Sequence, residues 1–389
     1  MNRGTDVTDQ KRKYRTAVGN EFPDKLSFSL DRDPNLSLRY GENPHQPAAL
    51  YRLDQNNLAE YINLRLAKGG KGGISTINLM DVARALNILK YFSKPSVAVM
   101  KHTIPSGFST QSNEEGLGDI YIKARDADRR SAFGSTVVLN RMMDRSTAEA
   151  VTSTYVEVVA APGYEENVME LLERKKDLRV MLFSDLETIP KFTGDDTDEG
   201  YDIRTLPTGH VLMQTPYLSS IRAKNDLILD PMVIKDEKNY VVNRDPTDRE
   251  LNDLLVAWYV NLGVRSNGIV FVRDGVTIAI GSGQQERVGA VEQAIIKAYQ
   301  KSMDRENISY DPIDGAVGRD ALYYNPLEGA VVSSDAFFPF RDSIDLIAKH
   351  GVSAVIQPGG SRNDYEVIEA VNEHNLAMAF TLERCFGHF

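Results

Sequence analysis

The stretch 101–107, with the sequence KHTIPSG, directly follows the apolar run SVAVM at residues 96–100. A short, valine-rich apolar run predicts a buried β-strand, and the polar residues, proline and glycine after it predict a loop. In open α/β sheets, ligands bind beyond the carboxyl ends of the strands. In an α/β fold, the stretch therefore marks the place where reactive side chains should lie.

Short β-branched runs alternate with helical patterns on both sides of this stretch, which is typical of layered α/β proteins. After a glycine-rich turn at 69–73, apolar residues at helical spacing predict a helix over 78–92, with Asn78 as its N-cap and Asp81 in its first turn. The other expected helices are 165–175, 248–262, 287–301 and 365–374. The other expected strands are 136–139, 157–161, 269–272, 277–281, 353–357 and 376–381.

This order of elements predicts two α/β lobes of similar size. We expect a polar N-terminal extension over 1–36, a first lobe over 37–200 and a second lobe over 201–389. The acidic stretch 191–201 (KFTGDDTDEGY) lacks apolar periodicity, so we expect it to be a loop between the lobes. No internal sequence repeat at a fixed period accompanies the two lobes.

Composition narrows the class of protein. Of the 389 residues, 42% are apolar and 26% are charged, which is ordinary for a globular protein. The 45 basic and 55 acidic residues give a net charge of −10, which disfavours binding to a nucleic-acid backbone. No apolar run reaches the ~18–20 residues of a membrane span, and the first 35 residues lack the apolar core of a secretory signal. We therefore expect a cytoplasmic protein that binds neither membranes nor nucleic acid.

The adjacent Lys101 and His102 are the first candidates for chemistry. Histidine titrates near neutral pH and can take up or release a proton, and a neighbouring ammonium can stabilise a developing oxyanion. The alternative is a solvated Lys-His pair at a strand end. Neither a metal nor a cysteine-based site is expected, because the six histidines show no ligand spacing and Cys385 is the single cysteine.

Two further polar segments could bind a ligand. Residues 39–46 (RYGENPHQ) offer Arg39 for a phosphate or carboxylate and Tyr40 for stacking or donation, although a capped turn is the commoner use of such a sequence. Residues 333–342 (SSDAFFPFRD) combine Phe337 with Asp342 and could hold a flat heterocycle, although core aromatics before a helix are the alternative.

Two glycine-rich segments, 281–285 (GSGQQ) and 357–361 (QPGGS), each follow an expected strand and precede an expected helix. The first lacks the third glycine of a dinucleotide-binding fingerprint, because Glu286 stands there and would oppose a pyrophosphate. We therefore expect strand-to-helix turns rather than a nucleotide cofactor site.

Taken together, the segments resemble one family in their order along the chain. The sequence is similar to the formyltransferase portion of the bifunctional enzyme AICAR (aminoimidazole carboxamide ribonucleotide) transformylase/IMP cyclohydrolase, from about Leu38 to the C-terminus. The resemblance rests on LRYGENPHQ, KHTIPSG, SAFGS, AAPGYEE, RSNGIVF, IGSGQQ, SSDAFFPFRDS, QPGGS and RCFGHF. It implies two cytidine-deaminase-like α/β/α lobes without the deaminase zinc. The family's cyclohydrolase portion has no counterpart before this region, which implies a stand-alone transformylase without cyclohydrolase activity.

The resemblance also implies roles for individual residues. In the family the Lys-His pair and the asparagine of the SN segment are catalytic, which assigns Lys101, His102 and Asn267. The implied substrate-binding residues are Arg39, Tyr40, Gly134, Glu157, Phe337, Asp342, Arg384 and Phe386. Three positions depart from the family pattern: Glu157, where aspartate is common, Glu286, where serine is usual, and the tail RCFGHF, where Cys385 or Gly387 replaces a histidine.

The implied reaction transfers the formyl group of the co-substrate 10-formyltetrahydrofolate to AICAR in purine biosynthesis. The family further implies a homodimer with active sites at its interface, a structural monovalent cation such as potassium, and a separate IMP cyclohydrolase for ring closure. Two alternatives are a sensor that binds AICAR or folate without catalysis, and formyl transfer to a related aminoimidazole.

Overall fold

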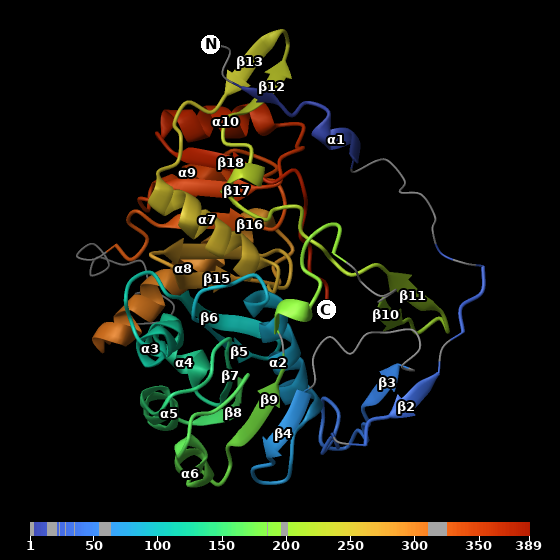
Figure 1. Cartoon of the computed structure of the whole chain (residues 1–389). Helices are drawn as coiled ribbons and strands as arrows, with labels where there is room; N and C mark the ends of the chain where they lie inside the picture. Colours follow the sequence, from blue (N-terminus) through green and yellow to red (C-terminus); the bar gives the residue numbers. More distant parts are fainter. Residues whose placement is uncertain are drawn as a thin grey trace.

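The computed structural model describes residues 4–13, 22, 24–27, 29–34, 36–53, 64–184, 186–195, 201–309 and 325–389. One large mixed sheet organises this part of the chain (Figure 1). Its eleven strands, named from one edge to the other, are β18 (Ala377–Phe380), β17 (Ala354–Gln357), β16 (Val331–Ser334), β14 (Ile269–Arg273), β15 (Val276–Gly281), β6 (Ile104–Thr110), β5 (Ser96–Lys101), β7 (Ser135–Leu139), β8 (Val156–Ala161), β9 (Arg179–Phe183) and β4 (Leu64–Lys68). The predicted α/β fold class is confirmed.

Smaller sheets lie outside the large one. They are formed by β1 (Thr5–Asp6) with β12 (Pro231–Lys235) and β13 (Lys238–Val241), by β2 (Leu30–Arg32) with β3 (Tyr51–Leu53), and by β10 (Asp202–Thr205) with β11 (Val211–Gln214). The helices are α1 (Gln10–Lys13), α2 (Thr76–Leu89), α3 (Leu117–Ala127), α4 (Arg129–Ala132), α5 (Arg145–Thr152), α6 (Val168–Glu173), α7 (Asp248–Asn261), α8 (Arg287–Glu306), α9 (Asp342–Ala348) and α10 (Asp364–Glu373), with 3-10 turns at Leu186–Thr188 and Lys224–Asp226. No helix within the described ranges is long and apolar enough to cross a membrane.

The two halves of the large sheet repeat one order of elements. In the first half, α2 precedes the β5–β6 hairpin, which is followed by α3, β7, α5, β8, α6 and β9. In the second half, α7 precedes the β14–β15 hairpin, which is followed by α8, β16, α9, β17, α10 and β18. The last three strands are parallel to one another in both halves. The halves join in one continuous sheet where β6 pairs with β15, so the division into lobes at residues 200 and 201 stays a prediction.

Helices cover both faces of the sheet. On one face, α2 and α7 lie over the first and second halves and share a single apolar core, in which Trp258 is fully buried. On the other face, α3, α5 and α6 cover the first half, and α8, α9 and α10 cover the second. The alternation of strand side chains between these cores agrees with buried strands: in β5, Val97 and Val99 face one core while Ala98 and Met100 face the other.

Several sequence-based predictions need correction. Helix α2 begins earlier than expected, because Ser75 is its N-cap and Asn78 closes the capping box from the third helical position. The stretch 101–107 is not a loop, because the chain reverses at His102 and Thr103 and continues directly as β6. Helix α3 and strand β16 were not predicted. Of the stretch 191–201, residues 191–195 form a tight loop closed on the Asp195 carboxylate, and 196–200 lie outside the described residues.

Candidate active site

Most of the predicted site residues lie along one edge of the large sheet, which here means the line formed by the ends of its strands and not an outer strand. Consecutive antiparallel pairings from β5 through β6 and β15 to β14 place the end of β5 and the start of β14 at the same edge. Strands β7 and β8 also start there, and β16 ends there. This edge holds Lys101 and His102 after β5, Gly134 before β7, Glu157 at the start of β8, Asn267 before β14 and Phe337 after β16.

The turn between β5 and β6 presents the Lys-His pair. The Lys101 ammonium donates hydrogen bonds to the carbonyl oxygens of Gly134 at 2.6 Å and Phe133 at 3.3 Å. His102 is exposed, with a positive φ of 54°, and Thr103 follows with a φ of 68°. The two residues therefore form the tight left-handed turn of a two-residue hairpin, with the imidazole at its tip.

The first turns of α2 hold this hairpin in place through hydrogen bonds. The buried Asp81 carboxylate accepts hydrogen bonds from the Thr103 backbone N–H at 2.6 Å and from the Thr136 hydroxyl at 3.2 Å. Burial raises the pKa of Asp81, and these hydrogen bonds only partly offset the rise. About one helical turn before Asp81, the Asn78 amide donates to Glu157 Oε2 at 3.2 Å. Glu157 thus lies close to the Lys101 region, as a shared site requires.

Arg39 and Tyr40 lie at the beginning of the same helix. The Arg39 guanidinium donates to the Tyr40 hydroxyl at 2.8 Å, and its carbon lies 4.5 Å from the centre of the Tyr40 ring. The Tyr40 carbonyl oxygen accepts from the Thr76 backbone N–H at 3.2 Å and from its hydroxyl at 3.0 Å. Helix α2 therefore connects five predicted residues, namely Arg39, Tyr40, Lys101, Gly134 and Glu157, into one group.

A second group surrounds Asn267. The Asn267 side-chain N–H groups donate to the carbonyl oxygens of Gln284 at 2.8 Å and Gln285 at 3.1 Å. Its Oδ1 accepts from the Arg287 guanidinium at 2.7 Å. Arg287 also donates to the fully buried Asp335 carboxylate, which fixes both side chains. The turn between β15 and α8 and the buried ion pair therefore hold the Asn267 amide in one orientation.

The C-terminal tail completes this second group. The exposed Phe386 ring lies 4.3 Å from the Arg384 guanidinium carbon and 5.8 Å from that of Arg287. Phe337 is half-buried and follows Asp335 by two residues after β16. Asp342 begins α9, where its carboxylate accepts from the Ser343 backbone N–H at 2.6 Å. The structure thus brings Arg384 and Phe386 together with Asn267. Asp342 instead binds the backbone in the first turn of its own helix.

The two groups are separated within one chain. Lys101 and Asn267 lie on strands β5 and β14, with β6 and β15 between them. Three interstrand spacings of ~4.8 Å put the two residues ~14 Å apart along the edge. The Lys101 ammonium is also held at the Gly134 and Phe133 carbonyl oxygens before β7, on the side of β5 away from β14. The two side chains therefore do not meet within a single chain in this arrangement.

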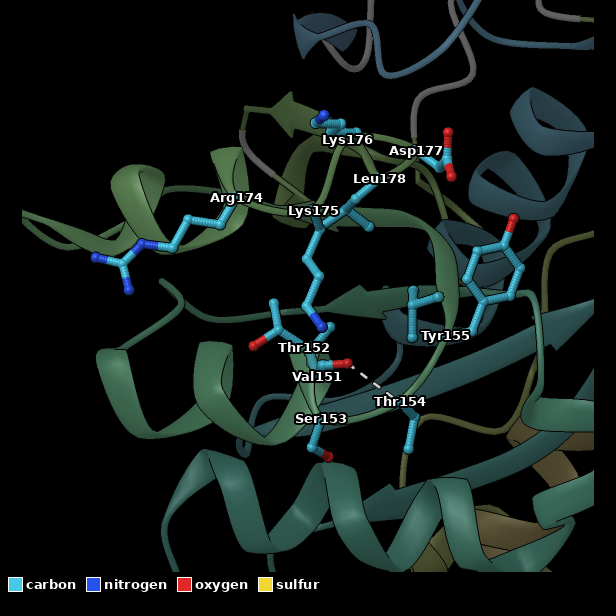
Figure 2. Close-up of a pocket in the computed structure, with 11 residues that line it drawn as sticks. Val151, Thr152, Ser153, Thr154, Tyr155, Arg174, Lys175, Lys176, Asp177 and Leu178 are labelled. Carbon is cyan, nitrogen blue, oxygen red and sulfur yellow. Dashed lines mark hydrogen bonds between the residues drawn. The ribbon is translucent and has the colours of Figure 1, made fainter.

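Several cavities open at this edge. One of about 280 Å³ lies beside the Lys-His turn and is lined by Lys101, His102, Ile104, Pro105, Ser106, Ala127, Asp128, Ser131, Ala279, Ile280, Ser282, Lys297 and Lys301. In it, Lys297 donates to the Ile280 carbonyl oxygen at 3.0 Å, and Lys301 pairs with Asp128 at 3.0 Å. A larger cavity of about 420 Å³ lies between the α5–β8 and α6–β9 loops, where Figure 2 shows Lys175 reaching across the gap while Arg174 points away.

The structure adds residues that sequence reasoning did not assign. Arg287 and Asp335 form the buried pair behind Asn267, and Asp81 holds the His102 turn. Each had a signal in a recognised segment: Arg287 directly follows GQQE, Asp335 lies in SSDAFF, and Asp81 falls at the predicted start of a helix. Sequence alone did not show that these polar residues are buried against the site rather than exposed.

Comparison with known proteins identifies the family. The family model described as AICARFT/IMPCHase bienzyme matches residues 7–297, and the chain therefore belongs to this family. A bifunctional purine biosynthesis protein PurH from Caldicellulosiruptor saccharolyticus is 35% identical over 372 residues, which cover 94% of this chain and 61% of the relative. Those from Persephonella marina and Magnetococcus marinus are 36% and 38% identical, covering 95% and 96% of this chain and 62% and 64% of the relatives. The chain spans about three fifths of the length of these curated relatives.

Proposed function

We propose that this chain is a folate-dependent formyltransferase that transfers the formyl group of 10-formyltetrahydrofolate to the 5-amino group of AICAR in purine biosynthesis. The observation that carries the proposal is the His102 turn and the Asn267 cluster at one sheet edge, in a chain of the AICARFT/IMPCHase family. The repeated order of elements supports two cytidine-deaminase-like lobes, here proposed to lack the deaminase zinc.

The reaction forms a bond from the amino nitrogen of AICAR to the formyl carbon and breaks the bond from that carbon to N10 of the folate. The amino lone pair is delocalised into the imidazole and carboxamide, so the attack needs a base. We assign this role to His102, whose imidazole is exposed and can accept the proton. The proton is then delivered to N10 as tetrahydrofolate leaves.

The formyl oxygen becomes negatively charged in the tetrahedral intermediate. Two of the three Lys101 N–H donors are directed at carbonyl oxygens of the described residues, which leaves the third to bind the developing charge. Lys101 is proposed to stabilise this oxyanion, an effect that is worth about 10²–10³-fold in rate for one well-placed donor. Asn267 is proposed to assist by exchanging its hydrogen bond to the Gln284 or Gln285 carbonyl oxygen for one to the oxyanion.

Both substrates are anionic, whereas the chain has a net charge of −10. Positive side chains are nevertheless concentrated at the candidate site, where Arg39, Lys101, Arg287 and Arg384 are found in the two groups. We propose that Arg39, Tyr40, Arg384 and Phe386 bind the nucleotide. Gly134, Glu157, Phe337 and Asp342 are assigned to the folate side.

The separation of the two groups supports a shared site. A homodimer in which one protomer supplies Lys101 and His102 and its partner supplies Asn267 would bring them together, although they lie ~14 Å apart within one chain. We therefore propose a homodimer with active sites at its interface, acting in the cytoplasm. Ring closure of the product is assigned to a separate IMP cyclohydrolase activity.

A structural monovalent cation such as potassium stays a prediction. The buried carboxylate best placed to hold one is Asp335, but its Oδ1 accepts from Arg287, and its Oδ2 accepts from the Ser266 hydroxyl at 2.6 Å and the Gly268 N–H at 2.8 Å. Arg287 thus neutralises the carboxylate, and the three donors occupy both of its oxygens. Its environment does not fit an additional cation, and no step of the mechanism uses one.

The proposal is tested with His102→Asn, because asparagine tolerates a positive φ and keeps the turn while removing the base. We expect turnover to be lost, while AICAR still binds with an affinity close to that of the wild-type chain. Tetrahydrofolate release followed spectrophotometrically, together with calorimetric titration of AICAR, measures both.

Near-wild-type turnover in His102→Asn would contradict the assignment of the base. In the wild-type chain, AICAR binding without tetrahydrofolate release would support the sensor alternative. Tetrahydrofolate release that requires a different aminoimidazole and not AICAR would support the second alternative, formyl transfer to a related aminoimidazole.

A further inference from the structure

The hairpin turn that carries His102 has a counterpart in the second half of the fold. In the β14–β15 hairpin, Asp274 and Gly275 have φ values of 54° and 76°, close to those of His102 and Thr103. In each half, the helix that precedes the hairpin supplies a buried aspartate to the turn: Asp81 from α2 and Asp253 from α7, each with 3% of its surface exposed.

The contacts made by the two aspartates correspond. Asp81 accepts from the Thr103 backbone N–H at 2.6 Å. Asp253 accepts from the Gly275 N–H at 2.8 Å and from the Asp274 N–H at 2.9 Å. A carboxylate that accepts a backbone N–H forms a strong, charge-assisted hydrogen bond. In each half, the aspartate of the preceding helix therefore holds the hairpin turn in place, and we call this contact the clamp. The second-half turn lies at the opposite edge of the sheet, away from the candidate site.

The sequences of the two turns differ in a way that matters. Asp-Gly is a favoured pair for a two-residue turn with positive φ at both positions, whereas a β-branched threonine at positive φ is an outlier. Left-handed backbone is unfavourable for a residue with a Cβ, because the Cβ approaches the following carbonyl oxygen. The His102–Thr103 turn is therefore less favourable by itself than the Asp274–Gly275 turn and depends more on its clamp.

We propose that Asp81 is a positioning residue for the formyl transfer, because its bond to the Thr103 N–H holds the strained turn that presents the His102 imidazole. The inference rests on the proposed role of His102 as the base. Asp81 is buried beneath the turn and acts through the backbone, without touching a substrate.

The charge environment distinguishes the two aspartates. Asp253 forms an ion pair with Arg249 at 3.1 Å, whereas the described hydrogen-bond donors of Asp81 are the uncharged groups of Thr103 and Thr136. Burial raises the pKa of Asp81, and the charges of His102 and Lys101 oppose that rise. The first-half carboxylate is thus coupled to the proposed catalytic pair, and the second-half carboxylate is coupled to a structural arginine.

Three variants of the full chain separate positioning from folding. Asp81→Ala removes the acceptor, Asp81→Asn keeps an oxygen that can accept from Thr103, and Asp253→Ala removes the equivalent clamp at the other edge. We expect kcat to fall about 10- to 100-fold in Asp81→Ala, in line with the effect of a small misplacement of a reacting group. We expect Asp81→Asn to retain kcat within about threefold, and KM for AICAR to stay unchanged in both variants.

Folding is followed by circular dichroism, and all assays are made at a temperature where each variant is folded. Asp253→Ala should be destabilised but keep the wild-type kcat. If Asp81→Ala does not fold, it is combined with Thr103→Gly, because glycine adopts the turn without the clamp. The double variant should then keep the kcat of Thr103→Gly alone, and a 10- to 100-fold fall below that value would overturn the inference.

Wild-type kcat in folded Asp81→Ala would overturn the inference, and so would an equal fall in Asp81→Ala and Asp253→Ala. Failure of Asp81→Asn to restore kcat would overturn it as well. A wild-type chain that releases no tetrahydrofolate would instead refute the proposed function itself.

Discussion

Gly134 shows how the site constrains a single backbone position. Its φ is 68°, and a Cβ placed there would lie 3.2 Å from Lys101 Nζ and 3.3 Å from Glu157 Oε1. The loop therefore passes between the two charged side chains, and an added Cβ would require one of them to shift by a few tenths of an ångström. Because Lys101 donates to the Gly134 carbonyl oxygen, any shift of this loop also moves the ammonium.

Gly134→Ala should accordingly reduce both stability and activity. We expect a loss of about 1–2 kcal/mol in the free energy of unfolding from the positive φ, and a fall in kcat from displacement of Lys101. Gly209→Ala is the matched control, since Gly209 has a φ of 80° and a Cβ added there would meet no atom of the described residues within 4 Å. Urea unfolding and steady-state kinetics check both; an unchanged kcat in Gly134→Ala would contradict the expectation.

The pH dependence of stability provides a separate test of Asp81. Burial raises the pKa of Asp81 above its usual 3.8. A carboxyl group raised in this way stabilises the fold while it is protonated, and that contribution is lost as the pH rises through the folded-state pKa. Asparagine stays neutral, so the free energy of unfolding of Asp81→Asn should improve relative to wild type between pH 4 and pH 7. Urea unfolding at pH 4 and pH 7 measures the difference in free energy of unfolding between Asp81→Asn and wild type. A difference that is the same at both pH values would refute the prediction.

Helix α7 shows what local sequence can determine at the scale of one element. Thr247 is its N-cap, and Glu250 accepts from the Thr247 N–H at 2.8 Å, which forms a capping box in front of an amphipathic run. The predicted range 248–262 matches the observed Asp248–Asn261 for this reason. By contrast, residues 101–107 looked like a loop because Pro105 and Gly107 are rare in strands, yet the tight turn lets the chain continue as β6.

Glu250 should make the stability of this element depend on acid pH. Burial alone would raise the pKa of Glu250, but hydrogen bonds from Arg244 and Thr247 outweigh it and lower the pKa to about 2. The stabilisation is therefore complete above the ordinary value of 4.5 and is lost as the pH falls toward 2. Glu250→Gln should be less stable than wild type at pH 7, by a margin that shrinks at pH 3.

Thermal unfolding at the two pH values measures that margin. Asp248→Asn, which removes an exposed carboxylate from the same first turn, controls for the loss of charge near the helix start. A margin that did not change with pH would show that the charge of Glu250 contributes little.

At the scale of the whole molecule, the ~14 Å between Lys101 and Asn267 makes a prediction about assembly. Lys101→Met and Asn267→Ala should each be inactive alone. If each site takes Lys101 from one protomer and Asn267 from its partner, a mixed dimer has one intact site. Random exchange of equal amounts then restores about 25% of the wild-type activity, because half of the dimers are mixed and each has half of its sites intact.

Activity is measured after the two variants are mixed under conditions that allow exchange of protomers, with mass spectrometry to confirm mixed dimers. No recovery in a sample that contains mixed dimers would show that Lys101 and Asn267 act within one chain.

Much of the candidate site was accessible from the sequence, because its residues lie in short polar segments directly after or before apolar strands. Lys101 and His102 were recognised in this way. The sequence did not show which polar residues are buried behind them, since burial of Asp335 and Arg287 depends on pairing between segments almost 50 residues apart. Nor could it show the spacing along the edge, because that depends on the order of strands in the sheet.

The continuous sheet also has a consequence for how the chain reaches its native state. The central contact between halves joins the Phe108 N–H to the Thr277 hydroxyl, across 169 positions of sequence. Most other neighbours in the sheet are joined by a hairpin or by a single crossover helix. Closing so long a loop is slow, because its entropy must be lost before the contact forms. We therefore expect each half to acquire its hairpin and helices early, and the docking of β6 against β15 to limit the rate of folding.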